Sequence, residues 1–316
     1  MRSFEGKIAV VTGGGSGMGR ELALQLVAMG CDVALCDIFP DTMAETRRLC
    51  VSQARQGTRV TTFLADVSSE DQVMAFADAV RCDLDTDRIH LLFNNAGIGG
   101  GGSFVDGSRE EWEKTFAVCW YGVYYCTRAF LPLLRNADEA HIVNTSSVNG
   151  FWASVGPARP HTAYCAAKFA VKGFTEALMT DLALNAPHIK CSVVMPGHIG
   201  TGIPTNSRKI LRGSETAIDT SAVRKLFAAQ GIDATSYSDD QIRARVAEME
   251  KRFHDNAPTS AAEAATIILE GVKAERWRIL VGKDAEFIDD RVRAAPKEAY
   301  SPAFFEALRK AAGWRI

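Results

Sequence analysis

The chain has 316 residues, of which 47% are hydrophobic and 23% charged, a balance typical of a globular protein rather than a disordered or fibrous one. Its 36 Lys and Arg residues against 38 Asp and Glu give a formal net charge of −2, so no basic excess favours nucleic acid or an anionic membrane as a partner. No window reaches the about 18 apolar residues of a membrane span, and the N-terminal apolar run is too short for a signal peptide. We therefore expect a soluble, cytoplasmic protein that binds neither nucleic acid nor membranes.

The cysteine and histidine patterns show neither a disulfide framework nor a metal site. The eight cysteines are scattered without a C-x-x-C pair, and the six histidines lack metal-binding spacing. We expect reduced, mostly buried thiols, as in a cytoplasmic protein, and no bound metal.

Short apolar runs alternate with amphipathic stretches along most of the chain. The runs predict strands over residues 7–12, 32–37, 59–66, 89–97, 140–147, 189–197 and 276–282. The stretches between them predict helices, the longest over about 109–134 and 161–186. Strands rich in Val, Ile and Leu that alternate with helices favour a parallel sheet covered on both faces. The expected fold class is α/β, a doubly wound parallel sheet of the Rossmann type, in a single domain over residues 1–316.

The alternation breaks after residue 197. Residues 202–256 are polar and helical in pattern, without strand runs, so they predict a helical insertion between the sixth and seventh strands. Residues 283–316 follow the seventh strand as a C-terminal extension.

A glycine-rich stretch, TGGGSGMG at residues 12–19, directly follows the first predicted strand and opens the first helix. Gly13, Gly17 and Gly19 allow a tight turn and let the backbone approach a pyrophosphate at the helix N-terminus. An ordinary glycine-rich turn is the alternative, but the strand–turn–helix context is that of a dinucleotide site.

Asp37 ends the second predicted strand. A carboxylate there can accept hydrogen bonds from the adenosine ribose hydroxyls and repels a 2′-phosphate. No Lys or Arg follows it in the segment DIFPD, so Asp37 favours NAD over NADP, although a solvated strand-end Asp is also common.

Tyr164 and Lys168 lie four residues apart in HTAYCAAKFAVKGF, a stretch with strong helix propensity. This spacing places the two side chains on one helix face. By itself the pair is typical of ordinary helical neighbours, so its meaning depends on the other motifs.

Five motifs follow one another on the expected elements: T-G-x-x-x-G-x-G at 12–19, NNAG at 94–97, a Ser at the end of the fifth strand, Y-x-x-x-K at 164–168 and PGHIGT at 196–201. In this order they resemble the short-chain dehydrogenase/reductase family over about residues 5–201, with the last helix and strand to about 282. The resemblance implies an NAD-dependent oxidoreductase that transfers a hydride between nicotinamide and a secondary alcohol or ketone. It also implies a homo-oligomer, a dimer or a tetramer.

The resemblance assigns roles to particular residues. Tyr164 is the general acid/base, Lys168 lowers the pKa of Tyr164 and binds the nicotinamide ribose, and Ser147 polarises the substrate carbonyl. Besides Tyr164 and Lys168, the expected cofactor-binding residues are Gly13, Ser16, Gly17, Met18, Gly19, Asp37, Asp66, Val67, Asn94, Ala96, Gly97, Pro196, Gly197, Ile199 and Thr201. The expected substrate pocket consists of Ser147, Asn149, Phe151, Trp152, Tyr164 and His198.

In families of this kind the segment after the sixth strand closes over the substrate, so residues 202–256 are expected to form a long lid that excludes water. Phe151 and Trp152 are expected to give the pocket an aromatic rim. Since no cluster of Lys or Arg lies near Ser147, the pocket favours a mainly apolar alcohol or ketone.

Two features depart from the family pattern. The connection from Ser147 to Tyr164 is longer than usual, and Cys119 occupies the position of an Asn that supports a water in the proton relay. Cys is only a weak hydrogen-bond donor and acceptor. Cys119 therefore leaves open an NAD-binding redox sensor or scaffold with lost or weak catalysis. An NADP-dependent carbonyl reductase is a second alternative.

Overall fold

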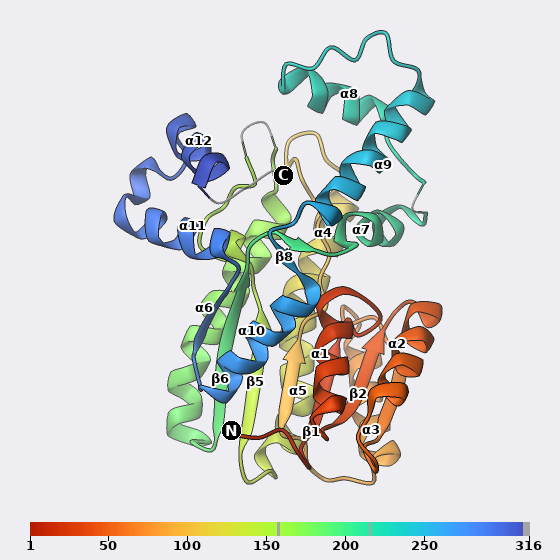
Figure 1. Ribbon diagram of the computed structural model, residues 1–316, viewed down its shortest axis with the longest axis vertical. Coiled ribbons are helices and arrows are strands. Elements are labelled where there is room, and N and C mark those ends of the chain that lie inside the picture. The colour runs from red at the N-terminus through yellow and green to blue at the C-terminus, as the bar shows by residue number, and fades with distance from the viewer. Residues whose placement is uncertain (157–158, 215, 312–316) are drawn as a thin grey trace.

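The computed structural model describes residues 1–156, 159–214 and 216–311. Within these residues a seven-stranded sheet has the order β3-β2-β1-β4-β5-β6-β9, and every neighbouring pair is parallel (Figure 1). The strands are β1 (Ile8–Thr12), β2 (Asp32–Asp37), β3 (Val60–Leu64), β4 (Leu91–Asn94), β5 (Ala140–Thr145), β6 (Ile189–Pro196) and β9 (Arg278–Val281). The predicted fold class, a doubly wound parallel sheet, is confirmed.

Helices cover both faces of the sheet because each strand alternates its apolar side chains between the two faces. In β1, Ile8 and Val10 enter one hydrophobic core, and Ala9 and Val11 enter the other. The first core packs against α3 (Glu70–Asp83), α5 (Gly122–Arg135) and α6 (Thr162–Asn185). The second packs against α1 (Gly17–Ala28), α2 (Pro40–Gln53) and α10 (Ala261–Lys273). No helix in the described ranges is long and apolar enough to cross a membrane.

The single helix predicted over 109–134 is interrupted. The structure has α4 (Arg109–Phe116), then a wide π-type turn over Ala117–Tyr121, then α5. Such turns insert one extra residue into a helix and often lie at functional sites. This one carries Cys119, which is fully buried.

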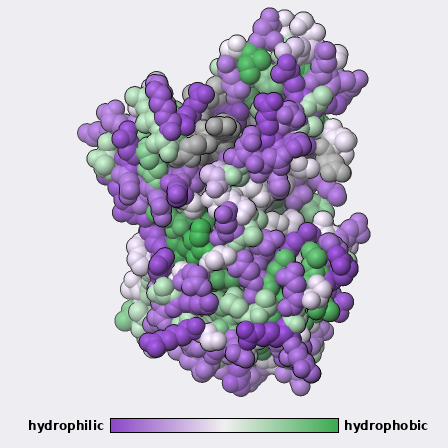
Figure 2. Space-filling view, in the orientation of Figure 1, coloured by the Kyte–Doolittle hydropathy of each residue, from purple (hydrophilic) through white to green (hydrophobic). Residues whose placement is uncertain are grey.

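The described residues of the predicted insertion form three helices, and a small strand pair flanks them on either side. They are β7 (Ile199–Gly200), α7 (Ile203–Arg212), α8 (Thr220–Ala229), α9 (Asp239–Asp255) and β8 (Thr259–Ser260), with β7 parallel to β8. Helices α8 and α9 share a small core of Phe227, Ala234 and Ile242. Figure 1 shows α8 and the adjoining end of α9 standing above the rest of the molecule as an arm, and Figure 2 shows this lobe with a mainly hydrophilic surface. Of these helices, α7 carries the residues that line the cleft described below.

The C-terminal extension begins with α11 (Lys283–Ala294), continues through a short 3-10 turn (Pro296–Glu298) and ends in α12 (Pro302–Ala311). Residues 312–316 of the predicted extension lie outside the described residues. In Figure 1, α11 and α12 lie on the opposite side of the upper half from α8. They form a third apolar cluster with Val148 and Trp152, from the segment that follows β5.

Candidate active site

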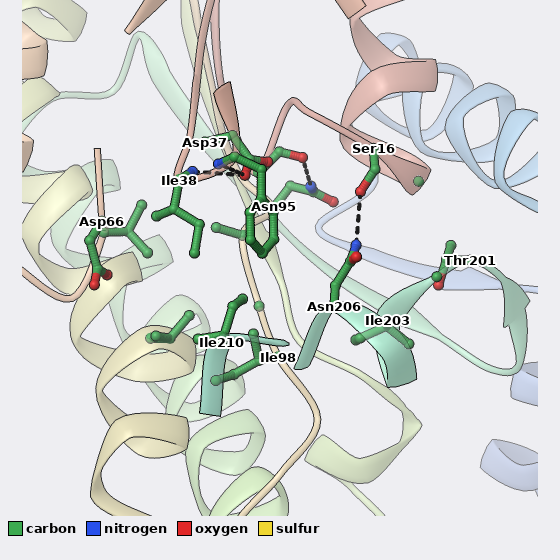
Figure 3. Close-up of a pocket in the computed structure, with 18 of the residues that line it drawn as sticks. Ser16, Asp37, Ile38, Asp66, Asn95, Ile98, Thr201, Ile203, Asn206 and Ile210 are labelled. Carbon is green, nitrogen blue, oxygen red and sulfur yellow. Dashed lines mark hydrogen bonds between the residues drawn. The ribbon is translucent and has the colours of Figure 1, made fainter. Parts of the chain in front are cut away.

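A cleft opens at the carboxyl ends of β1, β2 and β4, where the strand order of the sheet reverses (Figure 3). This is where doubly wound sheets bind their ligands. The expected cofactor residues that line it are Gly13, Ser16, Gly17, Met18, Asp37, Asp66, Val67, Ala96, Gly97 and Thr201.

The glycine turn after β1 packs closely against the loop after β4. The backbone φ is +67° at Gly13 and +54° at Gly17, a region that favours glycine. A Cβ at Gly13 would lie 2.9 Å from the Cα of Ala96, and one at Gly19 would lie 2.1 Å from the carbonyl oxygen of Gly13. The turn therefore brings the N-terminus of α1 to the cleft without side chains in between. This geometry fits the pyrophosphate of a dinucleotide.

Thr12 joins the end of β1 to the end of β4. Its hydroxyl accepts hydrogen bonds from the N–H groups of Asn95 and Ala96, each at 3.0 Å. The Asn95 side chain donates to the Thr12 carbonyl oxygen at 3.1 Å and lines the cleft. Asn95 is a cleft residue that the sequence did not single out.

The structure corrects the expectation for Asn94. Its side chain is buried and donates to the hydroxyl of Thr127 at 3.0 Å and to the amide oxygen of Asn144 at 2.8 Å. Asn94 thus ties β4 to β5 and α5 and does not line the cleft. Strand alternation turns neighbouring side chains to opposite faces, so only one of the two asparagines can face the cofactor.

Asp37 is fixed at the end of β2 by backbone N–H groups. One carboxylate oxygen accepts from Gly15 at 2.9 Å, and the other accepts from Ile38 at 2.7 Å and Phe39 at 3.1 Å. Asp37, Ile38 and Phe39 all line the cleft. The negative charge is therefore fixed in the lining of the cleft.

Asp66 lines the neighbouring wall together with Lys114. The Lys114 ammonium lies 2.6 Å from the Asp66 carboxylate and 2.9 Å from the Ser68 hydroxyl. Burial opposes ionisation of Asp66, but hydrogen bonds from Lys114 and Ser68 more than offset it and hold the pKa of this carboxyl below its ordinary value. Lys114 was not anticipated, and its charge is matched by Asp66.

Four residues of the PGHIGT segment were expected to bind the cofactor, and of these Thr201 lines the cleft. Ile199 is buried in the core beneath, and Pro196 ends β6. A Cβ at Gly197 would lie 2.2 Å from the buried carboxylate of Asp284. Pro196, Gly197 and Ile199 therefore support the cleft wall from behind.

Ser147, Tyr164 and Lys168 come together beyond Gly97. The Ser147 hydroxyl lies near enough to the Tyr164 phenol to lower the pKa of that phenol. The Lys168 ammonium lies 5.4 Å from the centroid of the Tyr164 ring and donates to the carbonyl oxygen of Thr145 at 2.8 Å. A Cβ at Gly97 would lie 3.4 Å from Lys168 Nζ, so the lysine reaches the end of the cleft. The three expected catalytic residues form one cluster.

The pKa of Tyr164 differs from expectation in this structure. Burial raises the pKa of the phenol well above its ordinary value, the nearby Cys119 adds to this, and the hydrogen bond from Ser147 acts in the opposite direction. Burial also lowers the pKa of the Lys168 ammonium. Tyr164 is therefore a neutral phenol at neutral pH, as a tyrosine of ordinary pKa also is.

Cys119 holds the loop that carries Gly97. Its thiol donates to the carbonyl oxygen of Ile98 at 3.2 Å. A Cβ at Gly97 would lie 3.8 Å from the Cys119 sulfur. The side chain therefore lies beside Lys168 as a packed donor rather than as an accessible nucleophile.

We expect Cys119→Ser to keep turnover, because a hydroxyl also donates to the Ile98 carbonyl, and we expect Cys119→Asn to show equal or higher activity. The measurement is kcat with the Kd for NAD. Alkylation of the native protein should label Cys82, which is exposed, without loss of activity. Complete inactivation of Cys119→Ser with folding and NAD binding intact would contradict this role.

The structure corrects the expected aromatic rim. Trp152 is completely buried, donates from Nε1 to the carbonyl oxygen of Ala299 at 2.7 Å and packs against two phenylalanines of α12. Phe151 packs against the same cluster, with the Arg278 guanidinium 5.4 Å from its ring centroid. Both aromatic side chains thus belong to the C-terminal cluster, because the extension covers them.

Two further residues of the expected substrate pocket have structural contacts. The buried amide of Asn149 donates to the carbonyl oxygens of Trp152 at 3.0 Å and Ser154 at 2.6 Å. His198 is buried, with Nε2 2.7 Å from the carbonyl oxygen of Phe253. Asn149 shapes the turn after β5, and His198 anchors the end of α9.

Helix α7 was expected only as part of a lid, and its individual residues were missed. Ile203, Asn206 and Ile210 line the cleft, and Asn206 donates to the Ser16 hydroxyl at 3.2 Å (Figure 3). At the other side of α7, the Ser207 hydroxyl accepts from the Gly99 N–H at 2.8 Å. The apolar spacing of Ile203 and Ile210, seven residues apart on one helix face, is the sequence signal for these contacts.

His161 is another unanticipated residue, and its ring lies against the Tyr164 ring with centroids 4.7 Å apart. A Cβ at Gly99 would lie 3.9 Å from both the His161 ring and the Ser207 hydroxyl. Burial lowers the pKa of His161 to about 4, so the imidazole is neutral at neutral pH. His161 thus gives the catalytic tyrosine a neutral, polar neighbour on the side of α7.

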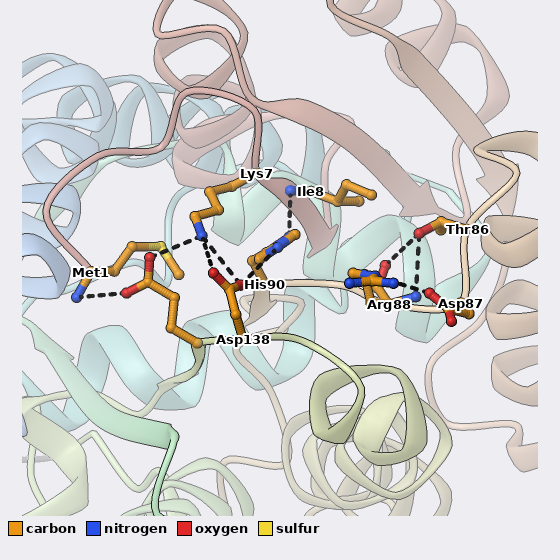
Figure 4. Close-up of polar contacts among 9 residues, drawn as sticks. Met1, Lys7, Ile8, Thr86, Asp87, Arg88, His90 and Asp138 are labelled. Atoms are coloured by element: carbon orange, nitrogen blue, oxygen red, sulfur yellow. Dashed lines mark hydrogen bonds and ion pairs between the residues drawn. The ribbon is translucent and has the colours of Figure 1, made fainter.

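The opposite end of the sheet carries a separate polar cluster (Figure 4). The Lys7 ammonium lies 3.4 Å from the Asp138 carboxylate, and His90 Nδ1 accepts from the Ile8 N–H at 3.1 Å. Burial lowers the pKa of His90, which keeps Nδ1 available as an acceptor. These contacts join the amino ends of β1 and β4, far from the cleft. No group of three or more potential metal ligands occurs in the described part of the chain.

Comparisons with known proteins agree with this geometry. A family model described as short chain dehydrogenase matches residues 7–211. Putative oxidoreductase SadH of Mycobacterium tuberculosis is 35% identical over 289 residues, 92% of this chain and 91% of that protein. Epidermal retinol dehydrogenase 2 of Homo sapiens is 34% identical over 203 residues, 64% of this chain and 63% of that protein. The chain belongs to the short-chain dehydrogenase/reductase family.

Solved structures give the same result. A short-chain dehydrogenase/reductase from Burkholderia phymatum in complex with NAD has a TM-score of 0.75 and 30% identity, and the match covers 94% of this chain and 96% of that one. A metagenomic short-chain oxidoreductase in complex with NADP has a TM-score of 0.54 and 30% identity, covering 61% and 83%. This chain is therefore an oxidoreductase of a family whose members bind NAD or NADP.

Proposed function

We propose that this protein is an NAD-dependent dehydrogenase or ketone reductase that acts on a mainly apolar secondary alcohol or its ketone. The observation that carries the proposal is the cluster of Ser147, Tyr164 and Lys168 next to Gly97, a residue of the cleft that the glycine turn opens. The test is oxidation of a panel of secondary alcohols with NAD, followed by the absorbance of NADH. Absence of turnover across a broad panel, with NAD bound, would contradict the proposal.

Each side chain of the cluster has a distinct task. When bound, the cofactor supplies or accepts the hydride. Tyr164 gives a proton to the substrate oxygen in reduction and takes it in oxidation, and Ser147 donates a hydrogen bond to the same oxygen. Lys168, held by the Thr145 carbonyl and close to both Gly97 and the Tyr164 ring, would bind the nicotinamide ribose.

Asp37 supports the choice of NAD. Its carboxylate lines the cleft and is held in place by three backbone N–H groups, so it cannot turn away from a 2′-phosphate. Structures of this family hold either cofactor, so the choice depends on this local charge. A cation also lies close by: the Lys209 ammonium of α7 is 4.6 Å from the Phe39 ring centroid.

We expect the protein to prefer NAD over NADP by kcat/KM. Asp37→Ala should lower the ratio of the two kcat/KM values by about tenfold or more, because it removes the repulsion between the carboxylate and the 2′-phosphate of NADP. Lys209→Ala is the matched variant and should weaken NADP more than NAD. A wild-type kcat/KM that favours NADP would overturn this assignment.

The raised pKa of Tyr164 predicts opposite pH dependences for the two directions. Reduction needs the protonated phenol, which is present at neutral pH, so its rate should fall only at alkaline pH. Oxidation needs the phenolate, so its rate should rise from neutral to alkaline pH. The measurement is kcat in both directions with saturating cofactor. An oxidation rate that declines as pH rises from neutrality would contradict this sign.

The apolar substrate is proposed from two observations. Ile98, Ile203 and Ile210 form the apolar wall of the cleft on the side of α7. A relative is named a retinol dehydrogenase, and retinol is an apolar alcohol. The substrate panel should therefore rank ring- or chain-bearing alcohols above small hydroxy acids in kcat/KM, and a small anion as the best substrate would defeat this part of the proposal.

A redox sensor or scaffold remains the second candidate, and Cys119 is the observation that favours it. Its thiol takes the place of a stronger polar group beside Lys168. Fluorescence of bound NADH during exposure to ketones separates the two candidates. A decline of the NADH signal indicates turnover, whereas binding without decline indicates a sensor.

A further inference from the structure

The turn that carries Ser147 is covered by the far end of the chain. Ser147 precedes a short 3-10 turn (Val148–Gly150), and its hydroxyl accepts from the Asn149 N–H at 3.1 Å. The same hydroxyl bonds to Tyr164. The orientation of the serine therefore depends on the conformation of this turn.

The turn is held in place by Asn149 and Trp152. The Asn149 side chain donates to the carbonyl oxygens of Trp152 and Ser154 and so closes the loop on itself. Asn149 and Trp152 are both buried, at 4% and 0% exposure. Any movement of Trp152 is thus transmitted through two hydrogen bonds to the Ser147 hydroxyl.

Trp152 is in turn fixed by residues of the C-terminal extension. Its indole donates to the Ala299 carbonyl oxygen at 2.7 Å, and its ring centroid lies 5.3 Å from Phe304 and 5.6 Å from Phe305. The next residue, Ala153, donates its N–H to the Tyr300 hydroxyl at 3.2 Å. Two hydrogen bonds and an aromatic cluster thus join this loop to residues 299–305.

The extension also lies outside the part of the chain that carries the family motifs. The matching family model ends at residue 211, whereas Ala299 is 147 residues from Trp152 in sequence. Val148 packs into the same cluster as Ala285, Phe304 and Leu308. The contact therefore lies outside the segment that the family model matches.

We propose that residues 299–308 are a positioning element of the active site, which fixes the Ser147 hydroxyl toward Tyr164 by holding Trp152. The inference rests on the proposed oxidoreductase function. Trp152 and Tyr300 are positioning residues, since neither touches the reacting atoms. A displaced serine lowers the rate because reacting groups tolerate little misplacement. It also removes the hydrogen bond that opposes the rise in the pKa of the phenol.

The experiment compares Trp152→Phe and Tyr300→Phe with wild type in the full chain. Each variant keeps an aromatic ring and removes one hydrogen bond to the loop. Lys310→Ala, on the exposed face of α12, is the matched control. The readouts are kcat for alcohol oxidation as a function of pH, the Kd for NAD and the melting temperature.

We expect Trp152→Phe to lower kcat by about tenfold or more, with the Kd for NAD unchanged and the rising limb of the pH profile moved to higher pH. Tyr300→Phe should lower kcat less, again with an unchanged Kd for NAD and a pH profile moved to higher pH. The other titratable groups around the phenol stay as they are: Cys119, Cys165, Lys168 and His161.

A lower melting temperature with wild-type kcat and an unshifted pH profile would show a purely structural contact and overturn the proposal. If Trp152→Phe does not bind NAD, Tyr300→Phe decides alone, because its side chain is 55% exposed and its replacement leaves the core intact. Absence of turnover in the wild-type protein would refute the proposed function instead, and this is seen before any variant is compared.

Discussion

Tyr164→Phe is expected to lower kcat by at least about 100-fold, the usual effect of losing a general acid/base, while the Kd for NAD stays unchanged. The phenylalanine ring keeps the contact with His161, and the loss is confined to the hydroxyl that bonds to Ser147. The measurement is kcat in both directions with NADH binding followed by fluorescence. The deficit should be present at every pH, because no other group of the cluster lies where it can replace the phenol.

Tyr121→Phe is the matched control, since this tyrosine is 43% exposed and its ring packs against those of Phe116 and Tyr125. Its kcat should equal that of wild type. Near-normal turnover of Tyr164→Phe would show that Tyr164 is not the general acid/base. The mechanism proposed for the cluster with Ser147 and Lys168 would then be wrong.

Patterns that are local in sequence predicted the fold and much of the cleft. The strands were predictable because each is buried on both faces and reads as a continuous apolar run. The glycine turn was predictable because Gly13 and Gly17 need conformations that favour glycine. The catalytic cluster followed from the order of motifs on these elements, and its three residues do lie together in the structure.

Contacts between distant segments were not predictable in this way. Trp152 was expected on the pocket rim because a tryptophan in a loop gives no sign of its cover, and the cover is Ala299 and α12. Asn94 was expected in the cleft, but Asn95 lines it. The sequence does not show at which residue β4 ends, and this decides which of the two side chains points into the sheet. The direction in which the pKa of Tyr164 shifts was not predictable because burial, its largest cause, is a property of the whole fold.

The long insertion divides into two parts whose effects on activity should differ. Helix α7 lies across the cleft, where Ile203 and Ile210 line it and Ser207 bonds to the Gly99 N–H. The arm formed by α8 and the start of α9 has its own small core around Phe227, stands above the rest of the molecule (Figure 1) and contributes no residue to the cleft lining. We therefore propose that α7, rather than all of residues 202–256, has the lid function.

We expect the double variant Ile203→Ala/Ile210→Ala to weaken NAD binding by about 100-fold. Each isoleucine that covers a bound ligand contributes about 1.5 kcal/mol, which is roughly tenfold in Kd. The kcat should fall as well, because a looser α7 admits water to the hydride path. Phe227→Ala, which disrupts only the core of the arm, is the matched control and should leave the Kd and kcat within about twofold, as for distant, independent sites. Titration of NADH fluorescence measures both variants. Equal losses in the two would show that the arm and α7 act as one lid, and an unchanged Kd in the double variant would show that α7 does not close over the cofactor.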